Sequence, residues 1–376
     1  MVEIREHAPG QDLGPFLQVA SGLYRDDPHW VQPLDKEQKD RLTPGANPFW
    51  EHGEGRLFTA WRGGQPVGRI SAQIDHNHLA RYGDGAGFFG FFDTRDDAEV
   101  ARALLERAEG WLRARGMTTC RGPFSLNINE EVGCLVEGFE TPPMVLMPHH
   151  GPWQGGLLEG AGYAKLKDLF FYLYDVPDEL PPRPKRAHEA MEKLPEVRFR
   201  SLDKRKMRAE VATFLEIFND AWQDNWGFVP ATDSEAEQMA ADFGLLADPE
   251  LAFFAEVEGE PVAFVVVLPN LYEAIQDLRG KLFPFGWATV LGRLKLGRPR
   301  TGRLIMLGIK QKMRGKKRYG ALSTALYAEV SRRGKRVGIE QAALGWTLED
   351  NNAINLGIRA MKAKRYKTYR IYEKAL

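Results

Sequence analysis

The chain has 376 residues, of which 43% are hydrophobic, 11% aromatic and 27% charged, so it can form two globular domains of roughly 150 to 200 residues each. Lys plus Arg and Asp plus Glu both number 51, and this balance offers no global field for a nucleic-acid partner. The two cysteines, Cys120 and Cys134, exclude a disulfide framework and fit no metal-binding spacing.

The first ten residues, MVEIREHAPG, lack a basic leader followed by an apolar run. No uncharged apolar stretch approaches the roughly 20 residues that a membrane-spanning helix needs. We therefore expect no transmembrane segment and a cytoplasmic location.

The first half of the chain alternates predicted strands and helices. Residues 57–72 read LFTAWRGGQPVGRISA, which predicts two strands joined by a tight turn. Residues 98–115 carry apolar side chains at helical spacing, with Asp96 and Asp97 as capping residues and Gly116 as the end signal. The other predicted strands of this half are residues 2–7, 87–93, 118–122 and 167–174.

A Pro-rich stretch, VPDELPPRP at residues 176–184, follows the last of these strands. Proline blocks both helix continuation and strand pairing, so this stretch predicts an extended linker over residues 177–196. The predicted domains are therefore residues 1–176 and residues 197–376.

The second half repeats the first. Residues 251–266 read LAFFAEVEGEPVAFVV, which matches the strand–turn–strand pattern of residues 57–72. The elements then follow in the same order, which predicts a duplicated α/β unit with two half-sites. The predicted elements of this half are strands 197–202, 252–269 (a hairpin), 303–309, 339–347 and 367–374, and helices 209–222, 235–246, 322–334 and 353–362.

Three stretches of the second half resemble the GNAT superfamily, the Gcn5-related N-acetyltransferases. They are the hairpin 256–267, the strand–loop–helix LIMLGIKQKMRGKKRYGALSTALYAEV and the tail LEDNNAINLGIRAMKAKRYKTYRIYEK. The first half is similar more weakly, so the chain resembles a bacterial group of tandem GNAT-like proteins. The resemblance implies an α/β (α+β) fold of two tandem GNAT-like domains, each with a mixed, mainly antiparallel central sheet flanked by helices.

The loop RGKKRYGA, residues 314–321, lies between the strand 303–309 and the helix 322–334 and is the candidate cofactor site. Such a loop presents free backbone N–H groups and the positive end of a helix dipole, which suit a diphosphate; a solvated helix entrance is the alternative. In the superfamily this loop binds acyl-CoA, so the resemblance implies acetyl-CoA or another acyl-CoA as co-substrate, and no metal. The implied cofactor-binding residues are Leu307, Ile309, Arg314, Gly315, Lys316, Lys317, Arg318, Tyr319, Gly320, Ala321, Asn351 and Asn352.

The equivalent loop of the first half contains three aspartates, Asp93, Asp96 and Asp97, and no glycine. Carboxylates at this place would repel a diphosphate. We therefore predict that the N-terminal domain does not hold CoA and supplies an acceptor wall, an interface or only stability.

Acyl transfer to an amine needs a deprotonated amine, a donor to the developing oxyanion and a proton for the leaving thiolate. The resemblance implies a tyrosine acid on the helix before the last strand, but Met361 and Leu158 stand at the corresponding positions of the two halves. Glu349 and Asp350, which follow the strand 339–347, are the candidate catalytic residues. Capping of the next helix is the alternative role for this pair.

A polar cluster, NINEE at residues 127–131, follows the central strand of the first half and could bind a polar acceptor, although loop composition alone also explains it. The vicinal His149 and His150 lack a third ligand at metal-binding spacing, so an exposed loop is favoured over a metal site. The candidate acceptor-binding residues are Asn127, Asn129, Glu130, Trp226 and Trp346.

The second half also holds an insertion, residues 271–302, that combines aromatic side chains with basic ones such as Arg293 and Arg298. It could form a lid, a membrane-surface contact, a dimer arm or a helix that covers the domain's own core. Because it interrupts the connection near the expected acceptor side, we favour a lid or an interface.

Three functions remain open. The favoured one is an acyl-CoA-dependent N-acyltransferase, with acetyl-CoA as the expected donor, that acts by direct transfer on a small-molecule or peptide amine. The alternative is a GNAT-fold binding or regulatory module without catalysis. An aminoacyl-tRNA-dependent transferase is disfavoured because the balanced charge predicts no nucleic-acid partner. A homodimer stays open.

Overall fold

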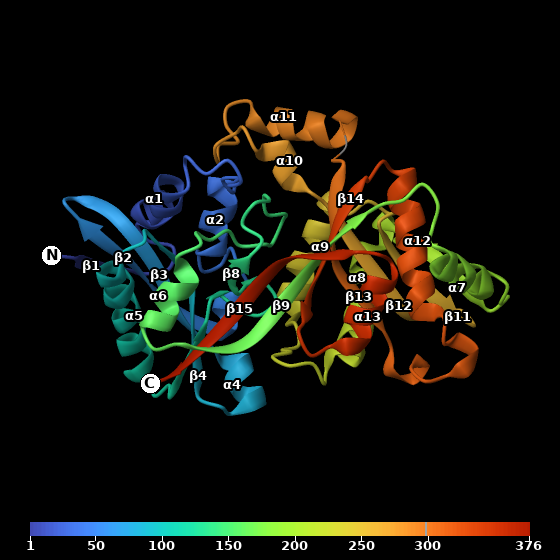
Figure 1. Ribbon diagram of the computed structural model, residues 1–376, viewed down its shortest axis with the longest axis horizontal. Helices are drawn as coiled ribbons and strands as arrows, with labels where there is room; N and C mark the ends of the chain where they lie inside the picture. The colour runs from blue at the N-terminus through green and yellow to red at the C-terminus, as the bar shows by residue number, and fades with distance from the viewer. Residues whose placement is uncertain (298) are drawn as a thin grey trace. The chain divides into compact units, whose positions relative to one another are not determined.

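The computed structural model describes residues 1–297 and 299–376 (Figure 1). Arg298 of the insertion lies outside the described residues. The chain forms two compact units that each combine separate segments. Unit 1 contains Met1–Leu169, Ile275–Val290 and Lys367–Leu376, and unit 2 contains Phe170–Ala274 and Leu291–Tyr366.

Unit 1 has a mixed, mainly antiparallel sheet in which only β4 and β5 are described as parallel neighbours. In spatial order its strands are β1 (Glu3–His7), β2 (Gly53–Arg62), β3 (Gln65–Asp75), β4 (Ala86–Thr94), β5 (Thr119–Gly122) and β15 (Lys364–Ala375); β8 (Cys134–Glu137) also pairs with β15, and β6 (Phe124–Ser125) and β7 (Glu131–Val132) form a separate pair. The helices of unit 1 are α1 (Leu13–Leu23), α2 (Asp35–Arg41), α3 (Phe49–His52), α4 (His76–Tyr82), α5 (Ala98–Arg113) and α6 (Gln154–Gly160).

Unit 2 has the same plan, with β13 and β14 as its described parallel pair. Its strands, in spatial order, are β9 (Ala164–Asp175), β14 (Gln341–Leu348), β13 (Thr301–Ile309), β12 (Glu260–Pro269), β11 (Ala252–Val257) and β10 (Val197–Ser201). Its helices are α7 (Pro182–Glu192), α8 (Met207–Trp222), α9 (Asp233–Leu246), α12 (Leu322–Arg336) and α13 (Asn352–Ala360). The helices α10 (Leu271–Ile275) and α11 (Gly286–Gly292) belong to the insertion.

The two hairpins are built alike. Each turn has two central residues with positive φ, Gly63–Gly64 in one and Glu258–Gly259 in the other, which is the backbone of a two-residue hairpin turn. Each hairpin then shifts register at a proline, since Pro66 lies opposite Trp61 and Pro261 lies opposite Glu256. A proline cannot donate to the ladder, so a bulge is a suitable place for it. The two hairpins that match in sequence therefore also match in turn conformation and in the position of the bulge.

The last strand of each half ends in the unit that the other half builds. The Lys367–Leu376 segment, with most of β15, belongs to unit 1, where β15 pairs with β5 and β8. In the same way, β9 enters unit 2 at Phe170 and lies next to β14. The cores follow this exchange, because Tyr372 is part of the unit 1 core and Tyr172 is part of the unit 2 core.

Part of the Pro-rich segment is helical, which differs from the extended linker expected over this stretch. The helix α7 starts at Pro182, where the fixed φ of proline suits a first helical turn and its missing N–H costs nothing. Its buried His188 lies 2.8 Å from the Glu329 carboxylate on α12, so α7 packs against α12 within unit 2. The domain boundaries expected from the sequence stay a prediction.

The first part of the insertion packs on unit 1. Its residues 275–290 are grouped with that unit, and the Asp35 backbone N–H at the start of α2 donates to the Gly280 carbonyl over 2.9 Å. Among the described residues, no helix is both long enough and apolar enough to cross a membrane.

Candidate functional site

The strand β13 has a β-bulge at Ile305. Its parallel ladder with β14 runs from Thr301 to Leu304, and its pairing with β12 slips at the next position, so that Ile305 is an extra residue in the strand. A bulge bends a strand away from its neighbour. Residues 302–304 are buried, whereas residues 305–307 are partly exposed. The second half of β13, with the predicted Leu307 and Ile309, therefore lies beyond the described end of the β14 ladder.

The loop after β13 is held at its start by acidic side chains of unit 2. Lys310 lies 2.6 Å from Glu216 and 3.0 Å from Glu260, and the Gln311 N–H donates to Asp220 over 2.5 Å. Arg314 donates to the Ala221 carbonyl at the end of α8 over 2.7 Å. These contacts fix where the chain turns toward α12.

The middle of the loop is exposed and basic. Gly315 adopts φ +76°, a conformation that favours glycine. Lys316 and Lys317 are exposed, and within the described part of the chain neither has an ion-pair partner. Arg318 instead donates to Glu196 over 2.6 Å, and hydrogen bonds, first from its own backbone and then from Arg318, lower the pKa of that carboxyl group.

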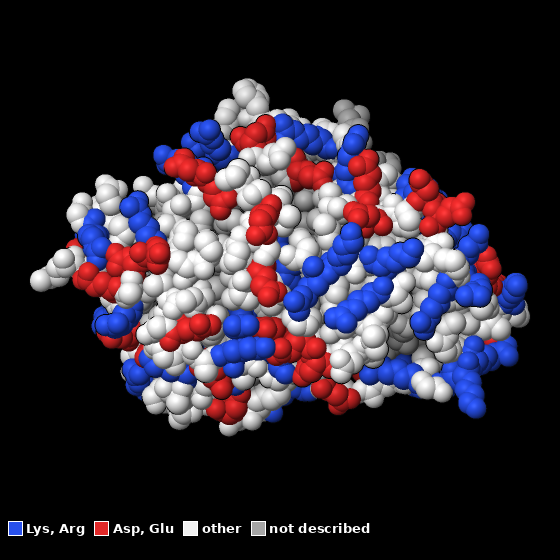
Figure 2. Space-filling view, in the orientation of Figure 1, with Lys and Arg blue, Asp and Glu red and all other residues white. Residues whose placement is uncertain are grey.

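The N-terminus of α12 carries no side-chain cap. Its N-cap residue is Ala321, which has no hydrogen-bonding side chain, so no side-chain cap occupies the first-turn N–H groups of Ser323 and Thr324. Figure 2 shows Lys and Arg side chains gathered over the region where α12 and α13 lie in Figure 1. Helix dipole, free N–H groups and lysines thus all favour negative charge here.

The equivalent helix of unit 1 closes its own N-terminus. The Asp97 carboxylate accepts hydrogen bonds from the N–H groups of Glu99 and Val100 at 3.1 and 3.2 Å, and it also pairs with Arg62. Burial raises the pKa of Asp97, but the Val100 N–H and the Arg62 guanidinium outweigh it, so the pKa is lowered. In unit 2 no side chain caps the first turn of α12, whereas in unit 1 the Asp97 carboxylate already occupies the corresponding N–H groups of α5.

We expect Asp97→Ala to lower the free energy of unfolding by about 1–2 kcal/mol, the usual cost of losing a helix cap. Urea unfolding at neutral pH measures this difference. Asp96→Ala is the matched control, because Asp96 is an exposed neighbour outside the cap. Equal losses for the two variants would show that capping is not what Asp97 contributes.

The segment after β14 places two of its predicted residues at the start of α13. Asn351 is the N-cap, and its side-chain oxygen accepts from the Ile354 N–H at 3.3 Å, whereas Asn352 is the exposed first residue of the helix. Glu349 is partly buried and Asp350 is exposed in the turn before them. A capping role is therefore observed for Asn351.

Sequence reasoning missed Asn355, which joins three elements of unit 2. Its side chain accepts from Thr347 on β14 at 2.6 Å and from Tyr172 on β9 at 3.2 Å, and it donates to the Leu348 carbonyl at 3.0 Å. Only 5% of Asn355 is exposed. The sequence did hold a signal that could have identified Asn355. It is a polar residue on the buried face of a predicted helix, one turn after the N-cap, and a buried polar side chain needs hydrogen-bond partners.

The two residues at the positions where the GNAT resemblance implies a tyrosine acid are core residues. Met361 belongs to the core of unit 2 and Leu158 to the core of unit 1. In unit 2 the partly buried Tyr366 is near Arg303; burial raises the pKa of Tyr366, and Arg303 opposes that change. Arg303 itself is buried and donates to the Gly345 carbonyl at 3.3 Å.

The predicted acceptor-binding residues belong to different units. Asn127, Asn129 and Glu130 are in unit 1, and Trp226 and Trp346 are in unit 2. The side-chain oxygen of Asn127 accepts from the Asn129 N–H at 2.9 Å, which makes a local turn.

Glu130 is tied into a structural network of unit 1. It receives a hydrogen bond from Asn47 at 3.1 Å and lies 3.3 Å from Arg41. Burial raises the pKa of Glu130 to about 7, against the opposing effects of Arg41 and Asn47. These contacts give Asn127 and Glu130 structural roles within unit 1.

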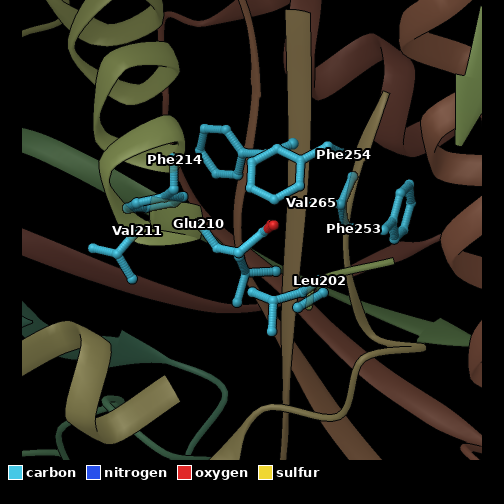
Figure 3. A pocket seen from close by; sticks show the side chains of 10 residues that line it. Leu202, Glu210, Val211, Phe214, Phe253, Phe254 and Val265 are labelled. Atoms are coloured by element: carbon cyan, nitrogen blue, oxygen red, sulfur yellow. The ribbon is translucent and has the colours of Figure 1, made fainter. Parts of the chain in front are cut away.

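A small cavity lies between α8 and the β11–β12 hairpin (Figure 3). Its volume of about 10 Å³ suits one water molecule, and its lining is apolar apart from Glu210, whose carboxylate pairs with Arg200 at 2.9 Å. It has no room for an acyl chain. No cluster of three or more metal-ligating side chains occurs among residues 1–297 and 299–376.

No family model matches the chain. It is 44% identical to the protein "Bacterial ceramide synthase" of Caulobacter vibrioides (strain NA1000 / CB15N) over 367 residues, which cover 97% of this chain and 95% of the relative. It is 40% identical to "Protein YghO" of Escherichia coli (strain K12) over 375 residues, which cover 99% of this chain and 95% of the relative.

Two solved structures are similar in fold over the whole chain. A tandem GNAT protein from the clavulanic acid biosynthesis pathway matches with a TM-score of 0.60 at 14% identity, covering all of this chain and 98% of the other. A Gcn5-related N-acetyltransferase from Sphaerobacter thermophilus matches with a TM-score of 0.52 at 14% identity, covering 100% and 95%. The tandem GNAT-like fold predicted from the sequence is confirmed.

Proposed function

This chain belongs to the family of the bacterial ceramide synthase of Caulobacter vibrioides and protein YghO of Escherichia coli, and from this premise we propose that it is an acyl-CoA-dependent N-acyltransferase. A ceramide is the amide of a fatty acid and a long-chain amino alcohol. We therefore propose a long-chain acyl-CoA as donor, in place of the acetyl-CoA expected from the sequence, and a long-chain amine as acceptor.

The observation that carries the proposal is the contrast between the two equivalent helix N-termini. The α12 N-terminus lacks a side-chain cap and follows exposed Lys316 and Lys317, whereas the α5 N-terminus is capped by Asp97. CoA carries a diphosphate, so only the uncapped, basic end has the electrostatics to bind it. The donor is therefore assigned to unit 2.

The transfer requires little from the protein beyond orientation and charge. The amine nitrogen attacks the thioester carbonyl carbon, the C–N bond forms, the C–S bond breaks, and one amine proton leaves as the CoA thiolate departs. We assign the stretch of β13 beyond Leu304 to hold the acyl-CoA, because that stretch is partly exposed where the β14 ladder has ended. Glu349 and Asp350 are proposed to accept the proton.

A second candidate is a binding module without catalysis. It is favoured by the burial of Met361, since the resemblance to the GNAT superfamily implies a tyrosine acid at that position. The enzyme must bind CoA, whereas the module need not, so a binding experiment tests the site and a turnover experiment tests the chemistry.

Binding of free CoA, measured by calorimetry and by the rise in melting temperature, is the first experiment. We expect Lys316→Glu/Lys317→Glu to weaken CoA binding about 10- to 100-fold, because two attractive charges become repulsive beside the diphosphate. Arg95→Glu is the matched control, since Arg95 is an exposed cation in the equivalent loop of unit 1. Unchanged affinity in the lysine variant would refute the assignment of this loop.

Turnover is the second experiment. The wild-type chain is incubated with sphinganine and either palmitoyl-CoA or acetyl-CoA, and the amide is detected by mass spectrometry alongside released thiol. We expect amide from the palmitoyl donor, with a lower rate from the acetyl donor. CoA binding without any amide would favour the non-catalytic module.

A further inference from the structure

The insertion exposes three aromatic side chains just before and within α11, the helix labelled in Figure 1. Phe283 is 76% exposed, Phe285 77% and Trp287 50%, and all three belong to unit 1. Large aromatic side chains exposed to this degree within five residues mark an interaction surface in a folded protein. We name Phe283, Phe285 and Trp287 the aromatic surface.

The charged residues nearest to the aromatic surface along the chain, Arg279 and Lys281, are basic. Residues 278–290, which belong to unit 1, contain Arg279 and Lys281 and no Asp or Glu, and the Asp35 carboxylate of α2 lies beside Gly280. Arg279 and Lys281 are exposed, and within the described part of the chain neither has an ion-pair partner. A partner for this surface must therefore be apolar at its centre and anionic around it.

The loop that carries the aromatic surface is folded. The Trp287 backbone N–H donates to the Leu282 carbonyl at 2.9 Å, and its indole N–H donates to the Pro284 carbonyl at 3.1 Å. Gly280 anchors the segment to Asp35. The aromatic rings are thus presented on a defined turn and lose little conformational entropy on binding.

We propose that the aromatic surface docks on a lipid bilayer that contains anionic head groups. Phe and Trp side chains partition into the boundary between head groups and acyl chains, and adjacent Lys or Arg side chains are attracted to anionic lipids. The inference depends only on this surface and does not require the proposed acyl transfer. Where both hold, docking places the enzyme at the surface where long-chain substrates reside.

Vesicle flotation of the full chain tests the proposal, with phosphatidylcholine vesicles prepared with and without phosphatidylglycerol. We expect the wild-type chain to float with the anionic vesicles and less with the neutral ones. Phe283→Ser/Phe285→Ser should lower the partition coefficient roughly tenfold for each side chain removed. Arg279→Glu/Lys281→Glu should remove the preference for anionic vesicles, by roughly fivefold for each charge, and more clearly at low salt.

Tyr82→Ser is the matched control, because Tyr82 is an exposed aromatic residue of unit 1 outside the aromatic surface. It should float like the wild type. The melting temperature of each variant checks folding, and CoA binding, which the variants should retain, separates this proposal from the previous one. Absence of flotation by the wild type, or equal flotation of the Phe variant, overturns docking; a dimer in size-exclusion chromatography that the Phe variant dissociates would assign the surface to a second copy instead.

Discussion

Removal of residues 367–376 is expected to unfold unit 1 while unit 2 keeps its fold. These residues belong to unit 1, where β15 pairs with β5 through residues 372–375 and with β8 through residues 368–370. The prediction has a large expected effect because β15 is an interior strand for unit 1 although it ends the second repeat.

The magnitude follows from burial. Tyr369, Ile371 and Tyr372 on β15 are fully buried. Loss of one such side chain costs about 3–5 kcal/mol, and a domain is stable by only about 5–15 kcal/mol. Removing all three, together with the ladder on two strands, exceeds the stability that unit 1 can have.

Hydrogen exchange read by mass spectrometry measures the result separately for each unit. In the truncated chain, β2, β3 and β4 should exchange freely, while β11 and β12 keep their protection. A synthetic peptide of residues 364–376 added in trans should restore part of the protection in unit 1. The prediction is wrong if β2 to β4 stay protected in the truncated chain without the peptide.

Arg69→Met is expected to destabilise unit 1 by about 3–5 kcal/mol, the usual cost of leaving a buried charge without its partner. Arg69 on β3 and Asp93 on β4 are cross-strand neighbours, are both buried, and form an ion pair at 2.7 Å. The Tyr24 hydroxyl also donates to Asp93 at 2.7 Å. Methionine fills much of the arginine volume, so the loss measures the charge and its hydrogen bonds.

The penalty should depend on pH. Burial raises the pKa of Asp93, but Arg69, His150 and the Tyr24 hydroxyl outweigh it, so the pKa lies below its ordinary value of 3.8. A depressed carboxyl pKa contributes stability above the unfolded pKa, and this contribution is lost as the pH falls through the folded pKa. In Arg69→Met the guanidinium no longer opposes the effect of burial, so the pKa of Asp93 rises. Asp93 then takes up a proton on acidification, and the cost of burying an unpaired carboxylate disappears.

Urea unfolding at pH 7 and at pH 4 measures the effect, and the difference between wild type and Arg69→Met should be smaller at pH 4. The double variant Arg69→Met/Asp93→Leu is the control, because replacing both charges by apolar side chains removes the uncompensated anion. It should recover most of the stability at pH 7. A double variant as unstable as the single one would show that packing, not charge, causes the loss.

Much of the fold could be predicted because the sequence signals for its hairpins and helices act between residues close together in the chain. The alternation of apolar residues in the hairpins, the apolar stripe of α5 and the aspartates before it all act within a few residues. The exchange of β9 and β15 could not be predicted, because alternation reports which face of a strand is buried and not which strand lies beside it. The helix α7 was missed because prolines also suit a first helical turn.

Some features of the candidate site could likewise be predicted from local sequence, and others could not. The loop after β13 could be located because glycine and basic residues between a strand and a helix have a local electrostatic meaning. The bulge at Ile305 and the buried role of Asn355 depend on partners far along the chain or on neighbouring elements, which no local pattern encodes. The capping role of Asp97 was predicted because an aspartate directly before an apolar helical stripe is a local signal.

The exchanged C-terminal strand also sets an order for biosynthesis. The ribosome makes β1 to β8 long before it makes residues 367–376, so the nascent N-terminal half waits with its β5 edge open while all of unit 2 is translated. Open strand edges are templates for wrong pairing. The half of the protein that is made first therefore finishes folding last, and its maturation depends on the chain's own tail arriving after translation of the rest.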